Sequence, residues 1–268
     1  MTEPIIFYDI DRKLTANESR AWNPNCWKTR YTLNIKGIPY RTVWVEYPDI
    51  KPLLLKVGAP AAEKLPDGTP LYTLPAIYDP NTQKAVADSA AIARYLDATY
   101  PTHGPRLIAA DADALHAAFQ VAFQTTLFEG MHLAYLCMPP SHDILNEPSA
   151  AYFKATREAH FGPFDELAPK GSEKRKRHWE GFKGNLGKIA GWFGADGKEK
   201  VLFSGGEEGK IVYADIVIAA QLRWMRAVFL EESEEWQDIV IWDGGRWKRL
   251  TEVFRKYEAV DEGTVAEL

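Results

Sequence analysis

Tyr-Thr-Leu-Pro at residues 72–75, directly before the apolar run Ala-Ile-Tyr at 76–78, is the most informative stretch of the chain for the fold. Its Leu74-Pro75 bond stands at the entrance to a predicted strand and can be cis, because proline removes most of the preference for the trans form. A cis bond would turn the Leu74 backbone outward, where an extended peptide could pair with it as an added strand. The stretch therefore predicts a peptide-binding edge at Leu74-Pro75.

Asp88-Ser89, thirteen residues after the proline, opens a predicted helix in which Ile92, Tyr95 and Leu96 share one face. The positive end of a helix favours a carboxylate, and the Asp88 carboxylate favours an ammonium group. Together the two residues suit the α-amino acid end of a small peptide. The alternative is that they only cap their helix.

The order of predicted elements is that of a thioredoxin-like fold followed by helices. Strands are expected at 4–9, 40–46, 76–78 and 84–87, with helices from Asn23-Pro24 to Gly37, at 49–56 and after Ser89. Pro101 to Pro105 indicates a linker. Beyond it, helices are expected at 111–137, 148–168, 173–193, 213–231 and 246–258. We therefore predict an α/β domain over 1–100, a linker over 101–110 and an all-α domain over 111–268.

Composition excludes several classes of function. Apolar residues make up 46% and charged residues 26% of the 268, as in ordinary globular proteins, and the formal charge of −5 argues against nucleic acid and anionic membranes as partners. Two cysteines favour a reducing, cytoplasmic location, and we expect neither a signal peptide nor a membrane span. The six histidines show no metal-ligand spacing with the cysteines, so no metal is expected.

Four further segments sharpen the classification: 23–31 (Asn-Pro-Asn-Cys-Trp-Lys-Thr-Arg-Tyr), 43–50 (Val-Trp-Val-Glu-Tyr-Pro-Asp-Ile), 78–82 and 87–93. With Leu74-Pro75 and Asp88-Ser89, they resemble the glutathione transferase superfamily from Phe7 to about Tyr257. The subclass they resemble is the fungal class A related to bacterial β-etherases. The resemblance implies the glutathione transferase fold, glutathione as co-substrate, a role in detoxification and a homodimer.

Asn23 stands where the family carries serine or cysteine beside the glutathione sulfur. Its amide and the free N–H groups of the helix end can favour a thiolate over a thiol, but an amide cannot be a nucleophile. The alternative is a plain N-cap. Asn25 can aim its amide at the same pocket, so Asn23 and Asn25 are the catalytic candidates. Cys26 is either a packing residue or an acidic thiol in the first helical turn.

The resemblance also implies the other site residues. Glutathione would be held by Leu74, Pro75, Asp88 and Ser89. Three lysines, Lys51, Lys56 and Lys64, are candidates for binding its glycine carboxylate. The second substrate would lie between the loop at 11–22 and the first helix of the second domain, where Phe119, Phe123 and Phe128 are candidates.

Three functions compete. The first is a glutathione transferase that acts on aromatic electrophiles, aryl ethers or esters. The second is a ligandin of low activity that sequesters plant-derived phenols, which the aromatic content and the missing serine both suit. The third is a glutaredoxin-like thiol transferase that uses Cys26.

Val212 occupies a position that in relatives begins a capping box with serine or threonine. Since valine cannot accept a hydrogen bond there, we expect about 1 kcal/mol less helix stability. Asp215 can still bond to backbone N–H groups.

Overall fold

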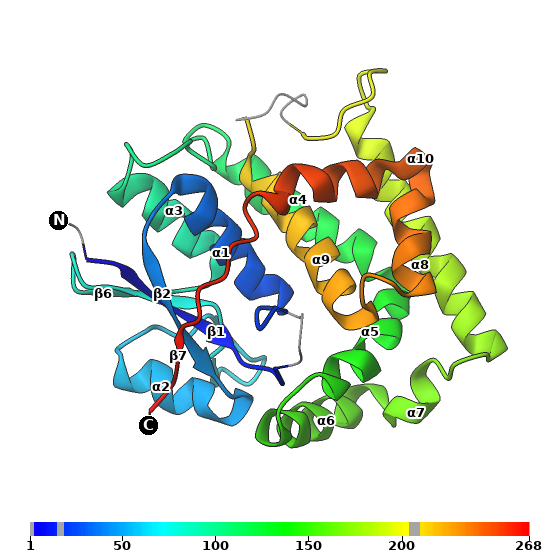
Figure 1. Cartoon of the computed structure of the whole chain (residues 1–268), viewed down its shortest axis with the longest axis horizontal. Helices are drawn as coiled ribbons and strands as arrows, with labels where there is room; N and C mark the ends of the chain where they lie inside the picture. Colours follow the sequence, from blue (N-terminus) through cyan, green and yellow to red (C-terminus); the bar gives the residue numbers. More distant parts are fainter. Residues whose placement is uncertain (1–2, 15–18, 204–209, 268) are drawn as a thin grey trace.

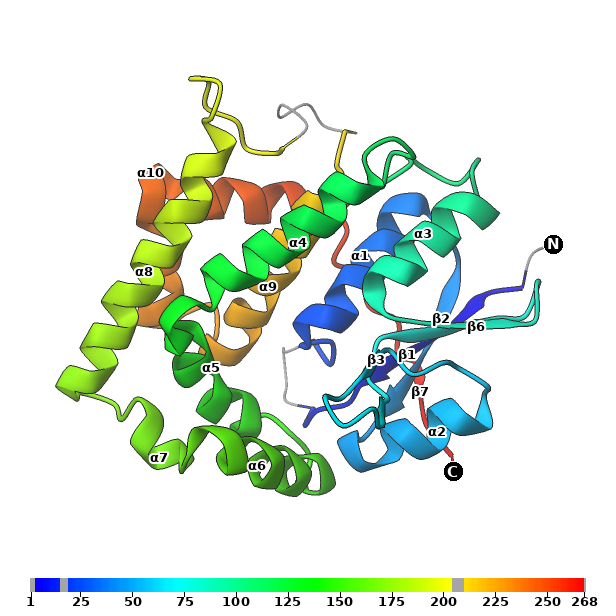
Figure 2. The ribbon, with the colours of Figure 1, turned by 180° about the vertical axis from the view of Figure 1, so that it is seen from behind.

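A computed structural model describes residues 3–14, 19–203 and 210–267, and it consists of a sheet domain beside a helical domain (Figure 1). The first domain contains β1 (Ile5–Ile10), α1 (Pro24–Lys36), β2 (Tyr40–Val45), η1 (Tyr47–Asp49), α2 (Ile50–Lys56), β3 (Glu63–Lys64), β4 (Pro70–Leu71), β5 (Ala76–Asp79), β6 (Lys84–Ala87) and α3 (Ser89–Thr99). Helices α1 and α3 cover one face of the sheet and α2 the other (Figures 1 and 2).

The predicted thioredoxin-like fold is confirmed by the strand pairing. β1 runs parallel to β2, β5 pairs antiparallel with β1, and β6 pairs antiparallel with β5. Local signals position α1 as expected, since Asn23 is its N-cap, Pro24 its first residue and Gly37 its left-handed C-cap at φ 63°. The short β3–β4 hairpin was not predicted.

The sheet has a fifth strand that the sequence did not indicate. β7 (Thr264–Val265) pairs parallel with β2 and gives the order β6-β5-β1-β2-β7. Asp261 accepts a hydrogen bond from the Thr42 backbone N–H at 2.7 Å, and the Trp44 indole donates to the Glu262 carbonyl at 2.8 Å. The end of the chain thus returns from the helical domain to the first one. The boundaries predicted for the two domains stay a prediction.

The second domain contains α4 (Asp113–Leu127), η2 (Glu129–Met131), α5 (His132–Asp143), α6 (Glu147–Phe161), α7 (Phe164–Leu167), α8 (Glu173–Phe193), α9 (Tyr213–Phe229) and α10 (Glu234–Arg255). The prediction for 173–193 matches α8, and α9 begins where predicted. The prediction for 246–258 missed the first turns of α10, which contains non-helical residues at 242–245.

The expected single helix over 111–137 is wrong. Gly130 and Met131 adopt left-handed conformations at φ 65° and 57°, which break the segment into α4 and α5. Pro139 and Pro140, which directly follow the predicted helix, lie inside α5 and do not end it. Because α5 packs against α8 and α9, tertiary contacts compensate for the hydrogen bonds that the prolines remove.

Helix α9 is buried along nearly its whole length and packs against α1, so it joins the two domains. Its N-cap, Val212, makes no side-chain cap hydrogen bond. Asp215, as predicted, bonds to backbone: it accepts from the N–H groups of Val212 at 3.0 Å and Phe203 at 2.8 Å.

Candidate functional site

A cavity of about 540 Å³ lies between the two domains. Its walls come from the start of α1, from η1 and α2, from residues 71–74 and from α6. Of the residues predicted from sequence, Asn23, Asn25, Lys51 and Leu74 line it. The structure thus brings the Leu74 edge and the start of α1 to one cavity, although they are far apart along the chain.

The Leu74-Pro75 peptide bond is cis, as predicted. The Leu74 side chain is buried, and the Pro75 carbonyl accepts a hydrogen bond from the Asp88 N–H at 3.3 Å. This bond connects the Leu-Pro turn to the start of α3. The pairing of Leu74 with a bound peptide stays a prediction.

Asp88 caps α3. Its carboxylate accepts hydrogen bonds from the N–H groups of Ala90 and Ala91 at 3.0 and 2.9 Å. The capping interpretation is therefore confirmed, and the carboxylate remains exposed, which is compatible with the predicted ammonium partner. Ser89 is buried and is the first residue of α3.

Asn23 caps α1 in the same manner. Its Oδ1 accepts from the N–H groups of Asn25 and Cys26 at 2.9 and 3.2 Å. The cap uses only the oxygen of the amide, so the NH₂ group remains available as a donor. Asn23 therefore serves as an N-cap while it also lines the cavity.

Asn25 is exposed at the cavity, and its Oδ1 accepts a hydrogen bond from the Lys28 ammonium at 2.9 Å. Sequence reasoning missed Lys28. Burial lowers the pKa of Lys28 to about 8, although the Asp88 carboxylate favours the charged form. Lys28 lies four positions after Pro24, about one helical turn, so its helical position near the site was the available signal.

Cys26 is fully buried, and the Asp9 carboxylate lies close enough to influence its thiol. Burial first, and then the Asp9 charge, raise the pKa of the thiol well above its ordinary value. A buried thiol with a raised pKa argues against the glutaredoxin-like hypothesis and favours the interpretation of Cys26 as a packing residue. Cys137 is likewise buried, and burial raises its pKa.

Among the three candidate lysines, only Lys51 lines the cavity. The Lys56 ammonium donates to the Glu267 carbonyl at 3.2 Å, and Lys64 lies in β3. The three predicted phenylalanines do not line this cavity. Phe123 is buried and stacks on Phe119 at 5.7 Å between ring centroids, within an aromatic cluster that includes Trp192 and Phe203.

The wall opposite α1 consists of residues that sequence reasoning did not single out: Tyr47 from η1, and Tyr152 and Arg157 from α6. The rings of Tyr47 and Tyr152 stack at 6.0 Å with an interplanar angle of 11°, and the Arg157 guanidinium lies 5.5 Å from the Tyr47 ring centroid. Tyr47 lies inside the 43–50 motif, which was the signal that could have identified it.

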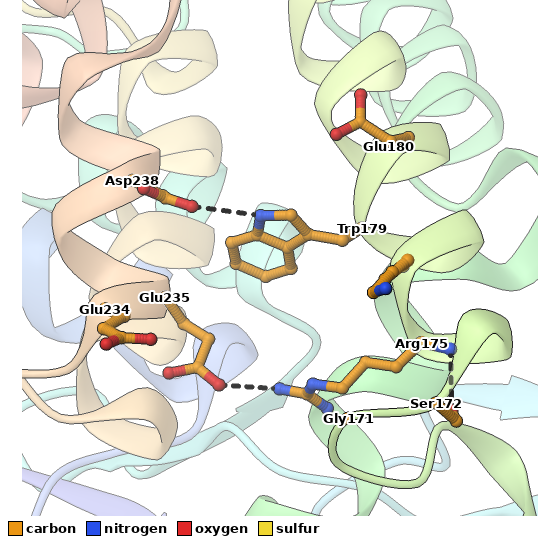
Figure 3. A pocket seen from close by; sticks show the side chains of 9 residues that line it. Gly171, Ser172, Arg175, Trp179, Glu180, Glu234, Glu235 and Asp238 are labelled. Atoms are coloured by element: carbon orange, nitrogen blue, oxygen red, sulfur yellow. Dashed lines mark hydrogen bonds and ion pairs between the residues drawn. The ribbon is translucent and has the colours of Figure 1, made fainter.

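A separate cavity of about 410 Å³ lies between the first turns of α8 and α10 (Figure 3). The Trp179 indole donates to Asp238 at 3.3 Å, and Arg175 pairs with Glu235 at 2.8 Å. It contains none of the predicted site residues.

Over the ranges 3–14, 19–203 and 210–267, no cluster of three or more His, Cys, Asp or Glu side chains could hold a metal ion. In the same part of the chain, no helix has the length and apolar character that crossing a membrane requires.

Comparison with known proteins adds independent findings. Residues 22–99 match the family model for the glutathione S-transferase N-terminal domain, and residues 114–257 match that for a C-terminal domain. A glutathione S-transferase-like protein of Aspergillus flavus, ustS, is 32% identical over 255 residues, which cover 92% of this chain and 88% of that protein.

Two solved structures are also similar over almost the whole chain. A glutathione S-transferase of Ceriporiopsis subvermispora, solved in complex with glutathione, is 46% identical with a TM-score of 0.91, covering 97% of this chain and 100% of that one. Glutathione transferase GSTFuA3 of Phanerochaete chrysosporium is 40% identical with a TM-score of 0.86, at the same coverage.

Proposed function

The chain belongs to the glutathione S-transferase family and is a glutathione transferase, and from this premise we propose that it activates the glutathione sulfur beside Asn23. The thiolate then attacks aromatic electrophiles or cleaves aryl ethers or esters. One observation carries the proposal: the Asn23 amide lines the same cavity as Leu74 while only its oxygen is used by the helix cap.

In this proposal the tripeptide lies along the Leu74-Pro75 turn. Its α-amino acid end meets the exposed Asp88 carboxylate and the start of α3 at Ser89. Its glycine carboxylate meets Lys51, the one of the three candidate lysines that lines the cavity. Each charged end of the peptide is thereby matched by an opposite charge.

The chemistry needs a thiolate rather than a thiol. The Asn23 amide, the positive end of α1 and the Asn25 side chain all favour negative charge on the sulfur and lower its pKa. The sulfur donates its electron pair to the electrophilic carbon of the second substrate, and the leaving group departs with the electrons of the broken bond. Asn23 forms no covalent bond in this scheme.

The decisive variants change Asn23 only. A hydrogen bond to a charged group contributes about 1.5–3 kcal/mol. At about 1.4 kcal/mol per pKa unit, Asn23→Ala should raise the pKa of the bound thiol by about 1–2 units. Asn23→Asp, which keeps the cap oxygen but has no amide donor, should raise it as well, whereas Asn23→Ser should keep it low.

The measurement is a pH titration of the thiolate absorbance of bound glutathione, alongside kcat/KM. If Asn23→Ala leaves both the thiol pKa and kcat/KM unchanged, the role assigned to this side chain is wrong. Asn23→Asp separates donor loss from cap loss, because aspartate is as good an N-cap as asparagine.

A second candidate function is a ligandin for plant-derived phenols. The stacked Tyr47 and Tyr152 rings and the Arg157 guanidinium at the cavity favour it, because they suit a flat, electron-rich ligand. The test supplies glutathione with an aryl ether or a hydroxybenzophenone. Thermal stabilisation without product after long incubation would favour the ligandin, and product formation the transferase.

A homodimer is part of the proposal. Leu115 and Val121 on α4 are 72% and 69% exposed, and we choose them as the apolar side chains with which to test for such an interface.

A further inference from the structure

Two cations line the cavity between the domains, and the proposed function uses only one of them. Lys51 from α2 is assigned to the glycine carboxylate of glutathione, whereas Arg157 from α6 has no role in binding the tripeptide. Among the described residues that line this cavity, none is Asp or Glu. The cavity therefore contains a positive charge that glutathione does not account for.

Arg157 is not neutralised by an acidic side chain of its own protein. Its Nη1 donates to the Thr156 Oγ1 at 2.7 Å, and it forms no ion pair within the part of the chain that the structure describes. The next residue, Glu158, instead accepts from the Phe164 N–H at 2.9 Å and pairs with Lys154 at 4.0 Å. Since a guanidinium has five N–H donors, most of those on Arg157 remain available to a ligand.

Aromatic rings determine where the guanidinium lies. Its central carbon is 4.5 Å from the ring centroid of Phe153 and 5.5 Å from that of Tyr47. An arginine held against rings in this way loses less freedom when a ligand binds it. Tyr152, which is 43% exposed, lies within 11° of parallel to Tyr47. This wall therefore combines a flat aromatic surface with a positive charge packed against it.

An aromatic ring that carries a carboxylate matches this wall. The ring can stack on the tyrosines, and the carboxylate can accept two parallel N–H bonds from the guanidinium. Tyr152 and Arg157 both come from α6, whereas every other lining residue lies between 10 and 74, in the first domain. In the proposed function, residues of the first domain alone bind the tripeptide. The wall formed by α6 is thus left for the second substrate.

We propose that Arg157 is a specificity-determining residue that binds a carboxylate on the second substrate, so that the enzyme prefers aromatic acids to uncharged aromatic electrophiles of the same size. The inference rests on the proposed function, which gives both carboxylates of glutathione other partners. With a chloronitrobenzoate, the thiolate sulfur forms a bond to the ring carbon that carries chlorine, and chloride leaves with the electron pair of the broken bond. Arg157 holds the ring and takes no part in that exchange.

The test compares a chloronitrobenzoate with the matched chloronitrobenzamide, which has nearly the same shape and no charge. Arg157→Met keeps an unbranched side chain against the rings. We expect it to lower kcat/KM for the benzoate about 10- to 100-fold, mostly through a higher KM, and to change that for the amide less than about 3-fold. Comparing each substrate between the two proteins cancels the difference in their intrinsic reactivity.

Two further variants serve as controls. Arg157→Lys keeps the charge but not the fork of N–H donors, so it should restore part of the loss. Lys248→Met removes an exposed cation of α10 that does not line the cavity, and it changes the net charge as Arg157→Met does. It should leave the ratio of the two kcat/KM values at the wild-type level. An equal loss for both substrates in Arg157→Met would contradict the inference, because charge recognition affects the benzoate alone.

A binding measurement separates this inference from the proposed function. Isothermal titration calorimetry with nitrobenzoate and nitrobenzamide, on protein saturated with S-methylglutathione, requires no reaction. If wild type forms product but Arg157→Met binds the nitrobenzoate as tightly as wild type does, the role of Arg157 is wrong and the proposed function stands. If wild type binds the nitrobenzoate through Arg157 but converts neither chlorinated compound, the proposed function is wrong and the preference for a carboxylate stands.

Discussion

Asp97 on α3 binds both the last residue of α1 and the linker between the domains. Its removal should therefore cost more free energy of unfolding than most single substitutions in the molecule. Its Oδ1 accepts from the Lys36 ammonium at 2.9 Å. Its Oδ2 accepts from the N–H groups of Leu107 and Ile108 at 3.0 and 2.9 Å. Only 2% of the Asp97 side chain and 1% of the Lys36 side chain are exposed, so water cannot replace these contacts.

Asp97→Ala removes the carboxylate that accepts hydrogen bonds from the buried Lys36 ammonium and from two buried backbone N–H groups. Removing one partner of a buried ion pair costs about 3–5 kcal/mol. At roughly 2–4 °C per kcal/mol for a chain of this size, Tm should fall by about 6–20 °C. The free energy of unfolding would be measured by urea titration, with the fluorescence of the nine tryptophans as the signal.

The double variant Asp97→Ala with Lys36→Met makes the reasoning refutable. Because Lys36→Met removes the orphaned charge, the double variant should be more stable than Asp97→Ala alone. It should stay below wild type, since the N–H groups of Leu107 and Ile108 still lack their acceptor. If the costs of the two single variants simply add, or if Asp97→Ala costs less than about 1 kcal/mol, the ion pair does not hold the linker as argued.

Three further predictions concern other parts of the chain. Iodoacetamide should label neither Cys26 nor Cys137 in the native protein, since burial raises the pKa of both thiols; rapid labelling detected by mass spectrometry would contradict their assignment as packing residues. Burial raises the pKa of Asp215 from 3.8 to about 6, so the stability that this raised pKa contributes is fully present below pH 3.8 and is lost as the pH rises through about 6. Wild type should therefore lose up to about 3 kcal/mol relative to Asp215→Asn between pH 4 and 7, and parallel stability curves for the two proteins would refute this. Leu115→Asp with Val121→Asp should halve the mass measured by light scattering if α4 forms the dimer surface; an unchanged dimer would place that surface elsewhere.

Much of the fold follows from local signals. Asn23-Pro24 and Gly37 mark the ends of α1 because capping depends on a few adjacent residues, and the cis bond at Leu74-Pro75 depends on one dipeptide. The break between α4 and α5 was missed because Gly130 looks like any glycine within a helical apolar pattern. Strand β7 was missed because two residues have no periodicity to detect.

The sequence by itself determined the thioredoxin-like order of elements, the start of α1 and the Leu74-Pro75 edge, since each depends on contacts within a few residues. Only the tertiary structure decided that Tyr47 and Asn23 line one cavity, that Lys51 rather than Lys56 or Lys64 reaches it, and that Phe119 and Phe123 belong to the helical core. These outcomes depend on how α1, η1 and α6 pack together. No local pattern encodes such packing, because side chains distant in sequence become neighbours only after the two domains close on each other.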